Sequence, residues 1–500
     1  MSRGLPLVYG LSALGAAAVL LPLGVLLALG LGSDVALGGQ VPAIALNTLL
    51  LTGLTVAGAI LLGVPLALLT AYTDLPGRGL WTALLAAPLA VPSYLGAFAY
   101  FAATGAGGEL SALTGLPVPN VDGLAGAAWV MTLYTYPFVF LATRAGLRNL
   151  DATALDAART LGMPLPTALV RVVLPRVRNS VAAGALLVAL YTLSDFGTPA
   201  IMRLDTFTRA IFVEYNAFGL ERAALLSLGL LGLVAVVLLL EWLVGTTREQ
   251  PGRTPRLHLG RTGRAAALVG VALVLLATLG MPLGVFTLGV LREGSGGLDP
   301  LLLLRSVSAS GLAAAAAVLL ALPVAYTATR GRVGRLLERV TYIGFGVPGI
   351  VLGTALVVVG LTLDFLYQSL ALLVLGYVVR FLSLAVGNIR APLERAEQGL
   401  VGAARSLGAA PGEAFRRVTL PLILPGLLAA GALVFLEVMR ELPATLLLRP
   451  TGFETLATHL WQVYEAGAFG RAALPALLLV VVSGAAVALM LRREQGAAER

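Results

Sequence analysis

The chain has 500 residues, of which 58% are hydrophobic and only 12% are charged, and its formal net charge is +9 at pH 7. Soluble domains average roughly 45–50% apolar and about 25% charged residues, so this composition indicates an integral membrane protein. All 34 basic residues are arginine and cysteine is absent, which excludes disulfides, thiolate metal sites and a cysteine nucleophile. Because a P-loop needs a lysine on the nucleotide phosphates, the chain is not expected to be an ATPase. The arginines separate apolar runs and form no patch with interleaved aromatic residues, so the expected surroundings are membrane lipid and not nucleic acid.

Apolar runs long enough to cross a membrane, which takes about 20 residues, recur along the whole chain. Twelve are predicted, centred on residues 8–31, 46–71, 81–102, 125–143, 181–197, 224–244, 266–290, 303–328, 341–361, 365–388, 425–439 and 473–491. The arginines gather after the even-numbered runs. Short cytoplasmic loops carry the Lys/Arg excess, so both termini are predicted to be cytoplasmic.

A long polar stretch rich in proline and glycine, TTREQPGRTPRLHLGRTGR at 246–264, lies near the middle of the chain. It is predicted to be a cytoplasmic linker between a first half at 1–245 and a second half at 265–500. A shift of 246 residues aligns Ala157 with Ala403, Ala158 with Ala404, Arg159 with Arg405, Leu161 with Leu407, Gly162 with Gly408 and Pro175 with Pro421. The sequence therefore predicts an internal repeat of six helices per half, with the same orientation in each.

The repeated polar segments lie at 151–175 and 397–421, after the fourth and tenth predicted spans. A short helix with one apolar face that ends at a glycine is predicted from the helical spacing of Leu155, Ala158, Leu161 and Gly162. A second amphipathic segment follows and ends at Pro175, where the next span is expected to begin. One interpretation is a surface helix that rests on anionic headgroups. The duplication favours a docking surface that is used twice.

The pattern of two alanines, a glycine four residues later and a Leu-Pro further on resembles the EAA loop of ATP-binding-cassette (ABC) importer permeases. The resemblance to these permeases extends over essentially the whole chain. The resemblance implies the type I importer fold, an all-α membrane protein of twelve transmembrane helices in two homologous halves. It implies that the two loops contact two copies of a cytoplasmic ABC ATPase, that those partners bind ATP and Mg, and that an extracytoplasmic binding protein delivers the solute. This chain itself is expected to bind no cofactor.

The residues that the resemblance assigns to ATPase coupling are Asp156, Ala157, Ala158, Gly162, Pro175, Ala403, Ala404, Gly408 and Pro421. The second copy departs from the motif, because Gly402 stands where the first copy has Asp156. Glu394 and Glu397 precede the second motif and are candidates to replace the missing acid.

The segments LYTLSDFGTPAIMRLDTFTRAIF, from residue 190, and FLEVMRELPATLLLRPTGFETLATHLW, from residue 435, resemble ferric-iron import permeases, with thiamine and phosphonate permeases as near relatives. Carboxylates near a membrane core are costly and usually mark a pathway or an ion pair, and hard oxygen ligands suit a trivalent cation. The candidate transport-path residues are Tyr191, Asp195, Glu437 and Glu441, which the 246-residue shift relates in pairs. The alternative is that the acids only pair with Arg203 and Arg440, and no metal ligands are assigned.

Three further expectations complete the prediction. Tyr134, Tyr136 and Tyr377 are expected to anchor their helices at the membrane interface. Three prolines in the third and ninth spans are expected to kink those helices, the alternative being that they break them: Pro88, Pro92 and Pro348. The rival class is a secondary transporter driven by an ion gradient, which gives no reason for the repeated loop, and a membrane-embedded enzyme lacks any supporting motif.

Overall fold

The computed structural model describes residues 5–33, 35, 38–105, 107–151, 153–244, 257–293, 299–397 and 399–484. Within these residues nine helices are long and apolar enough to cross a membrane. Six are regular: α1 (Leu5–Leu31), α2 (Val41–Tyr72), α6 (Gly123–Arg148), α12 (Leu220–Val244), α15 (Pro300–Ala328) and α18 (Leu370–Glu397). Three contain a π turn: α8–η2–α9 (Leu165–Ala168, Leu169–Val173, Leu174–Ser194), α13–η3–α14 (Arg261–Leu275, Leu276–Gly280, Met281–Glu293) and α20–η4–α21 (Pro411–Ala414, Phe415–Thr419, Leu420–Met439).

Two further spans are broken in the middle. The first consists of α3 (Arg78–Ala86), η1 (Ala87–Ala90) and α4 (Ser93–Ala103) and bends by 86°; the second consists of α16 (Arg332–Gly346) and α17 (Gly349–Thr362) and bends by 107°. The expectation that prolines only kink these spans is therefore wrong. Pro92 and Pro348 each sit at the N-cap of the second helix with ψ of 137° and 140°. The extended backbone at each proline redirects the chain. The proline ring fixes φ, and the residue has no N–H that could bond to the preceding helical turn.

The last predicted span, 473–491, is described only as far as residue 484, within an apolar helix at Phe469–Gly484 that begins with η5 (Phe469–Ala472). The short remaining helices are α5 (Glu109–Thr114), α7 (Thr153–Thr160), α10 (Gly197–Ile201), α11 (Phe207–Asn216), α19 (Leu400–Ser406), α22 (Pro443–Leu448) and α23 (Leu456–Glu465). The all-α membrane fold expected from the sequence is confirmed. Residues 246–256 of the predicted linker and both chain ends lie outside the described residues.

The fifth and eleventh spans begin earlier than the sequence suggested. The second amphipathic segment of each repeated loop is continuous with the span, so Pro175 does not mark a new start. The Leu174 N–H donates to the Leu169 carbonyl, and the Leu420 N–H donates to the Phe415 carbonyl, each five residues back. This wider π turn accommodates a proline ring that would clash with the carbonyl four residues earlier in a regular helix.

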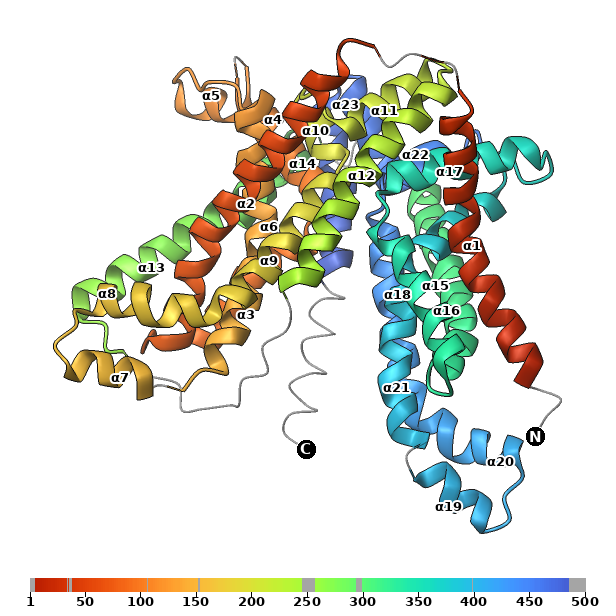
Figure 1. Cartoon of the computed structure of the whole chain (residues 1–500). Helices are drawn as coiled ribbons and strands as arrows, with labels where there is room; N and C mark the ends of the chain where they lie inside the picture. Colours follow the sequence, from red (N-terminus) through yellow and green to blue (C-terminus); the bar gives the residue numbers. More distant parts are fainter. Residues whose placement is uncertain are drawn as a thin grey trace.

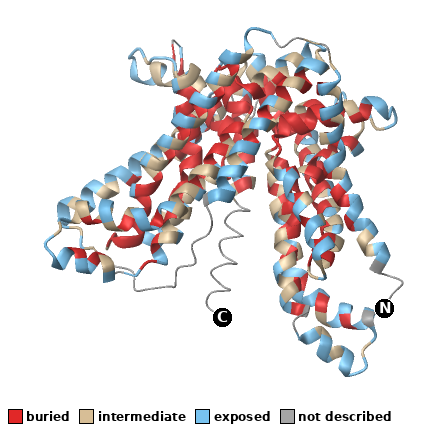
Figure 2. Ribbon diagram, viewed as in Figure 1, coloured by how far each residue is buried: buried red, intermediate tan, exposed pale blue. Residues whose placement is uncertain are grey.

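Two legs of helices diverge from a common junction, and α7 and α19 lie at the far ends of the two legs (Figure 1). We call this side of the molecule the motif end. The opposite side carries α5, α11, α22 and α23 and is called the distal end. Buried residues gather where the legs join, whereas exposed positions follow the outer helix faces and the loops (Figure 2).

The two halves exchange their first spans. Helix α1 packs against α15, α16 and α17 of the second half, where the Thr327 hydroxyl donates to Ser12 Oγ at 3.1 Å. Helix α14 packs against α4 of the first half. The π turn η3 is held there by two first-half hydroxyls, from Tyr100 to the Ala277 carbonyl at 3.0 Å and from Tyr134 to the Thr278 carbonyl at 2.9 Å. The halves are therefore interlocked.

The predicted interfacial role of three tyrosines is wrong, because the packing of the helices buries their side chains. Tyr134, Tyr136 and Tyr377 are all at most 2% exposed. Each hydroxyl bonds inside the protein, and Tyr377 contacts Thr445 Oγ1 at 2.8 Å. A buried phenol needs such a partner, so these side chains stabilise helix contacts and do not anchor the helices in headgroups.

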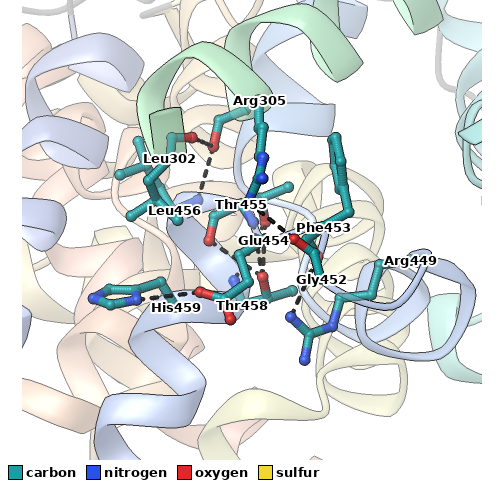
Figure 3. Close-up of polar contacts among 11 residues, drawn as sticks. Leu302, Arg305, Arg449, Gly452, Phe453, Glu454, Thr455, Leu456, Thr458 and His459 are labelled. Atoms are coloured by element: carbon teal, nitrogen blue, oxygen red, sulfur yellow. Dashed lines mark hydrogen bonds and ion pairs between the residues drawn. The ribbon is translucent and has the colours of Figure 1, made fainter. Parts of the chain in front are cut away.

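The distal end repeats one hydrogen bond in both halves. The Phe207 N–H, at the start of α11, donates to Thr48 Oγ1 at 3.1 Å. The Leu456 N–H, at the start of α23, donates to Ser306 Oγ at 2.8 Å. Figure 3 shows the second of these sites, where Arg305 also reaches the Gly452 carbonyl at 2.9 Å. Helix N-termini leave such donors unsatisfied, and here a neighbouring span satisfies them in the same way twice.

Candidate functional site

A small, partly open cavity of about 100 Å³ lies beside the bends of the two broken spans. Its wall consists of the start of α4, the end of α9, the end of α21 and the start of α22, with one arginine from α18. Regular helices satisfy their own backbone groups, so four helix ends meeting here bring free polar groups together inside the membrane-spanning region. All four candidate transport-path residues line this cavity: Tyr191, Asp195, Glu437 and Glu441.

On the first-half side of the cavity, Asp195 follows the last residue of α9. Its Oδ2 accepts a hydrogen bond from the Ser93 hydroxyl at 2.9 Å, and its Oδ1 accepts one from the Gly197 N–H at 3.1 Å. The Tyr191 hydroxyl donates to Ser93 Oγ at 3.3 Å. Arg203, the partner considered from the sequence, lies elsewhere, over the ring of Phe101 at 5.2 Å. Among the described residues, Asp195 is thus held by neutral donors and forms no ion pair.

On the second-half side, both acids are paired with arginines. Glu441 Oε2 lies 3.3 Å from Arg380 Nε, and the two side chains are only 7% and 13% exposed. Arg380 comes from α18 and not from the sequence neighbourhood of Glu441. Glu437 instead pairs with Arg440, one turn further along the chain. Both glutamates are therefore paired, but the partner of Glu441 is Arg380 and not its neighbour Arg440.

The cavity is also a junction between the halves. Arg440 Nη1 donates to the Leu89 carbonyl of η1 at 2.8 Å, which ties the second half to the bend in the first. Toward the distal end, the Tyr464 hydroxyl donates to the Ile201 carbonyl at 3.0 Å. The rings of Phe196 and Trp461 lie 5.0 Å apart between the same halves. These contacts join the halves on the distal side by aromatic packing, whereas the legs diverge on the motif side (Figure 1).

The two motif helices present the coupling candidates at the other end of the molecule. In α7, Leu155 and Ala158 are buried whereas Asp156 and Ala157 are exposed. Leu161 was expected on the buried face but is 88% exposed, because the helix ends at Thr160 and the turn points the leucine outward. The equivalent Leu407, after α19, is 89% exposed.

Both motif helices end in the same glycine turn. Gly162 has φ of +84° and Gly408 has φ of +92°, in the left-handed region that glycine adopts without strain. The next N–H in each copy reaches back to the helix, from Met163 to the Ala158 carbonyl at 3.0 Å and from Ala409 to the Ala404 carbonyl at 3.1 Å. The remaining candidates of the second copy, Ala403 and Pro421, lie in α19 and just beyond η4. Each glycine turn redirects the chain toward the next span and leaves a surface of small residues exposed.

No group of three or more His, Cys, Asp or Glu side chains suited to a metal ion occurs among the described residues. Sequence reasoning missed three residues of the cavity. Arg380 had a usable signal, since it is a lone arginine inside an apolar run. Ser93 and Tyr94 had none, because they reach the cavity only through the break that follows Pro92.

Comparison with known proteins agrees with this geometry. Residues 315–495 match the family described as binding-protein-dependent transport system inner membrane component. The chain is 30% identical over 461 residues to the Fe(3+)-transport system permease protein FbpB 2 of Haemophilus influenzae, covering 89% of this chain and 88% of the relative. It is 27% identical to a probable ABC transporter permease of Sinorhizobium fredii, covering 82% and 80%. A probable molybdenum ABC transporter permease of Haloferax volcanii is 28% identical over 40% of this chain and 75% of the relative.

The fold and the two motif helices define a multi-pass transport permease of the inner membrane. The chain belongs to the family of binding-protein-dependent ABC importer permeases. The predicted class is therefore confirmed, and the family is one of transport proteins and not of enzymes.

Proposed function

We propose that this permease carries ferric iron inward, with ATP hydrolysed on two partner ATPases and the solute delivered by an extracytoplasmic binding protein. The observation that carries the substrate assignment is Asp195, a half-buried carboxylate on the cavity that has neutral hydrogen-bond donors and no arginine partner among the described residues. The cavity then holds three carboxylates against two guanidinium groups, which favours a cation over molybdate or a phosphonate. Similarity to the iron permease over most of both chains supports the same assignment.

The motif end is proposed to face the cytoplasm. The arginine pattern of the sequence supports this orientation, and α7 and α19 then lie together on the side where ATPases dock. The coupling surface would consist of Asp156, Ala157, Gly162 and Pro175 in one half, supported by the buried Ala158 on the inner side of α7, with Ala403, Ala404, Gly408 and Pro421 in the other. Two equivalent helices at the ends of two legs favour one ATPase on each. ATP and Mg would be bound by those partners.

Transport would proceed by alternating access. When the ATPases close, α7 and α19 move toward each other and the legs follow, because each motif helix continues through a glycine turn into a membrane span. The junction at the cavity, where the halves meet, then opens toward the distal side. Tyr191, Asp195, Glu437 and Glu441 would face the solute at that point.

The test is uptake by the full complex of permease, ATPases and binding protein in proteoliposomes. Radiolabelled iron should accumulate only when ATP is present on the ATPase side, whereas labelled molybdate, phosphonate and thiamine should not. Uptake of one of those solutes without iron would overturn the substrate assignment. Iron uptake driven by an ion gradient without ATPases would favour a secondary transporter instead.

A further inference from the structure

The two halves contribute very different chemistry to the cavity, although their backbones correspond. Pro92 and Pro348 cap α4 and α17 in the same conformation, so Ser93 is equivalent to Gly349 and Tyr94 to Ile350. The 246-residue shift likewise relates Tyr191 to Glu437 and Asp195 to Glu441. The first half therefore supplies a carboxylate and three hydroxyl groups, whereas the second supplies two carboxylates at these positions.

The second-half positions are already occupied by ion pairs. A Cβ atom built on Gly349 would lie 2.5 Å from Glu441 Oε1 and 3.0 Å from Arg380 Nη1. The missing side chain thus makes the room in which this ion pair sits. Glu437 is neutralised in turn by Arg440. A second-half carboxylate could offer its full charge to a cation only by giving up a partly buried arginine partner, which is costly.

The first-half positions remain available. Tyr94 lines the cavity, is 6% exposed, and its hydroxyl has no hydrogen-bond partner among the described residues. Buried polar groups are nearly always paired, so an unpaired phenol on a cavity indicates a ligand that completes its bonding. The Tyr191 hydroxyl donates to Ser93 and the Ser93 hydroxyl donates to Asp195, and these three residues line the cavity together with Tyr94.

We propose that Ser93, Tyr94, Tyr191 and Asp195 form an asymmetric contact site for a hard trivalent cation, and that Glu437 and Glu441 stay neutralised by their arginines during passage. This assignment rests on the proposed function for a cationic solute. Carboxylate and hydroxyl oxygens are the ligands that hard cations prefer. One formal charge in the set gives contact that is strong enough to admit the ion and weak enough to release it.

The experiment measures cation binding without transport, using terbium(III) as a hard trivalent probe and its luminescence on tyrosine excitation as the readout. Purified full-length permease should show saturable sensitised emission. Asp195→Asn should weaken terbium binding roughly tenfold or more, because it removes the only formal charge of the set. Tyr94→Phe should weaken it by a smaller factor, whereas Tyr136→Phe, a buried tyrosine bonded to the Leu85 carbonyl away from the cavity, should not change it.

The matched control is the double variant Arg390→Gln with Glu338→Gln, which removes one acid and its cation together from the contact of α16 with α18, outside the cavity. It should bind terbium within about twofold of wild type, since neutralising both partners of a buried pair leaves no stranded charge. Melting temperatures verify that each variant is folded. Unchanged binding in Asp195→Asn, no saturable binding in wild type, or loss in the double variant equal to that in Asp195→Asn would each overturn the site. The proposed function fails separately, if wild-type proteoliposomes take up no iron.

Discussion

The exposed leucines at the tips of the two motif helices offer a direct test of coupling. Leu161 and Leu407 are 88% and 89% exposed, so replacing them by serine removes almost no contact within the permease and should leave its stability unchanged. Full burial of a leucine side chain contributes about 1.5–3 kcal/mol. If each leucine enters a groove of a partner ATPase, each substitution should weaken that contact by roughly 10- to 150-fold, at about 1.4 kcal/mol per factor of ten.

Binding of the purified ATPase to permease in nanodiscs, measured by titration, gives this number directly. The variants Leu161→Ser, Leu407→Ser and the double variant should lose affinity stepwise and lose ATP-dependent uptake with it. Leu116→Ser is the matched control, because this leucine is 65% exposed and follows α5 at the distal end. Affinity within a factor of two of wild type in the double variant would refute a docking role for the motif tips.

Three other predictions concern the glycine turns, the orientation and the linker. Gly408→Val should uncouple ATP hydrolysis from uptake, whereas Gly408→Asn should retain much of the coupling, because asparagine tolerates the left-handed backbone and nothing lies within 4 Å of an added Cβ; equal loss in both would contradict a backbone origin. Thr262→Cys should react with an impermeant thiol reagent only from the cytoplasmic side and Ala112→Cys only from outside, and the reverse pattern would invert the orientation. The Arg264 guanidinium, with the Leu259 N–H and His258, holds the pKa of Asp74 well below its ordinary value of 3.8, so the stabilisation is present above that value and is lost as pH falls below it. Protection of the Leu259 amide from hydrogen exchange, relative to its intrinsic exchange rate at each pH, should therefore fall below about pH 4 in wild type, and should already be lower at pH 7 in Asp74→Asn.

The membrane spans could be predicted from the sequence because they depend on a local pattern. An apolar run must form a helix in lipid, whatever it packs against, since every backbone group has to be satisfied within it. The breaks at Pro92 and Pro348 were harder to predict, because a proline inside a span can either bend or interrupt it, and the choice depends on what replaces the lost hydrogen bonds. The exchange of α1 and α14 between halves left no local signal at all.

The candidate cavity likewise combines features that the sequence predicts with features that it does not. Asp195 and Glu441 were selected because carboxylates are rare in membrane spans and these two correspond in the repeat, and the structure places both on one cavity. Their different charge partners could not be predicted. Arg380 reaches Glu441 from a helix sixty-odd residues earlier, through space that exists only because Gly349 has no side chain. The repeat predicts where equivalent residues lie. Whether an acid there is neutralised depends on neighbouring residues that differ between the two halves.

The arrangement of the junction explains how movement at the motif end can reach the cavity. Arg440 is tied to Glu437 in its own half and to the Leu89 carbonyl in the other, at the bend of the broken span. Because α1 and α14 each pack against the opposite half, we expect the legs to rotate about the region where they join and not to separate. A rotation that brings α7 and α19 together would then act on the contact of Arg440 with the Leu89 carbonyl, since Arg440 also lies on the wall of the cavity. The same residue that neutralises Glu437 thus connects the state of the cavity to the relative position of the halves.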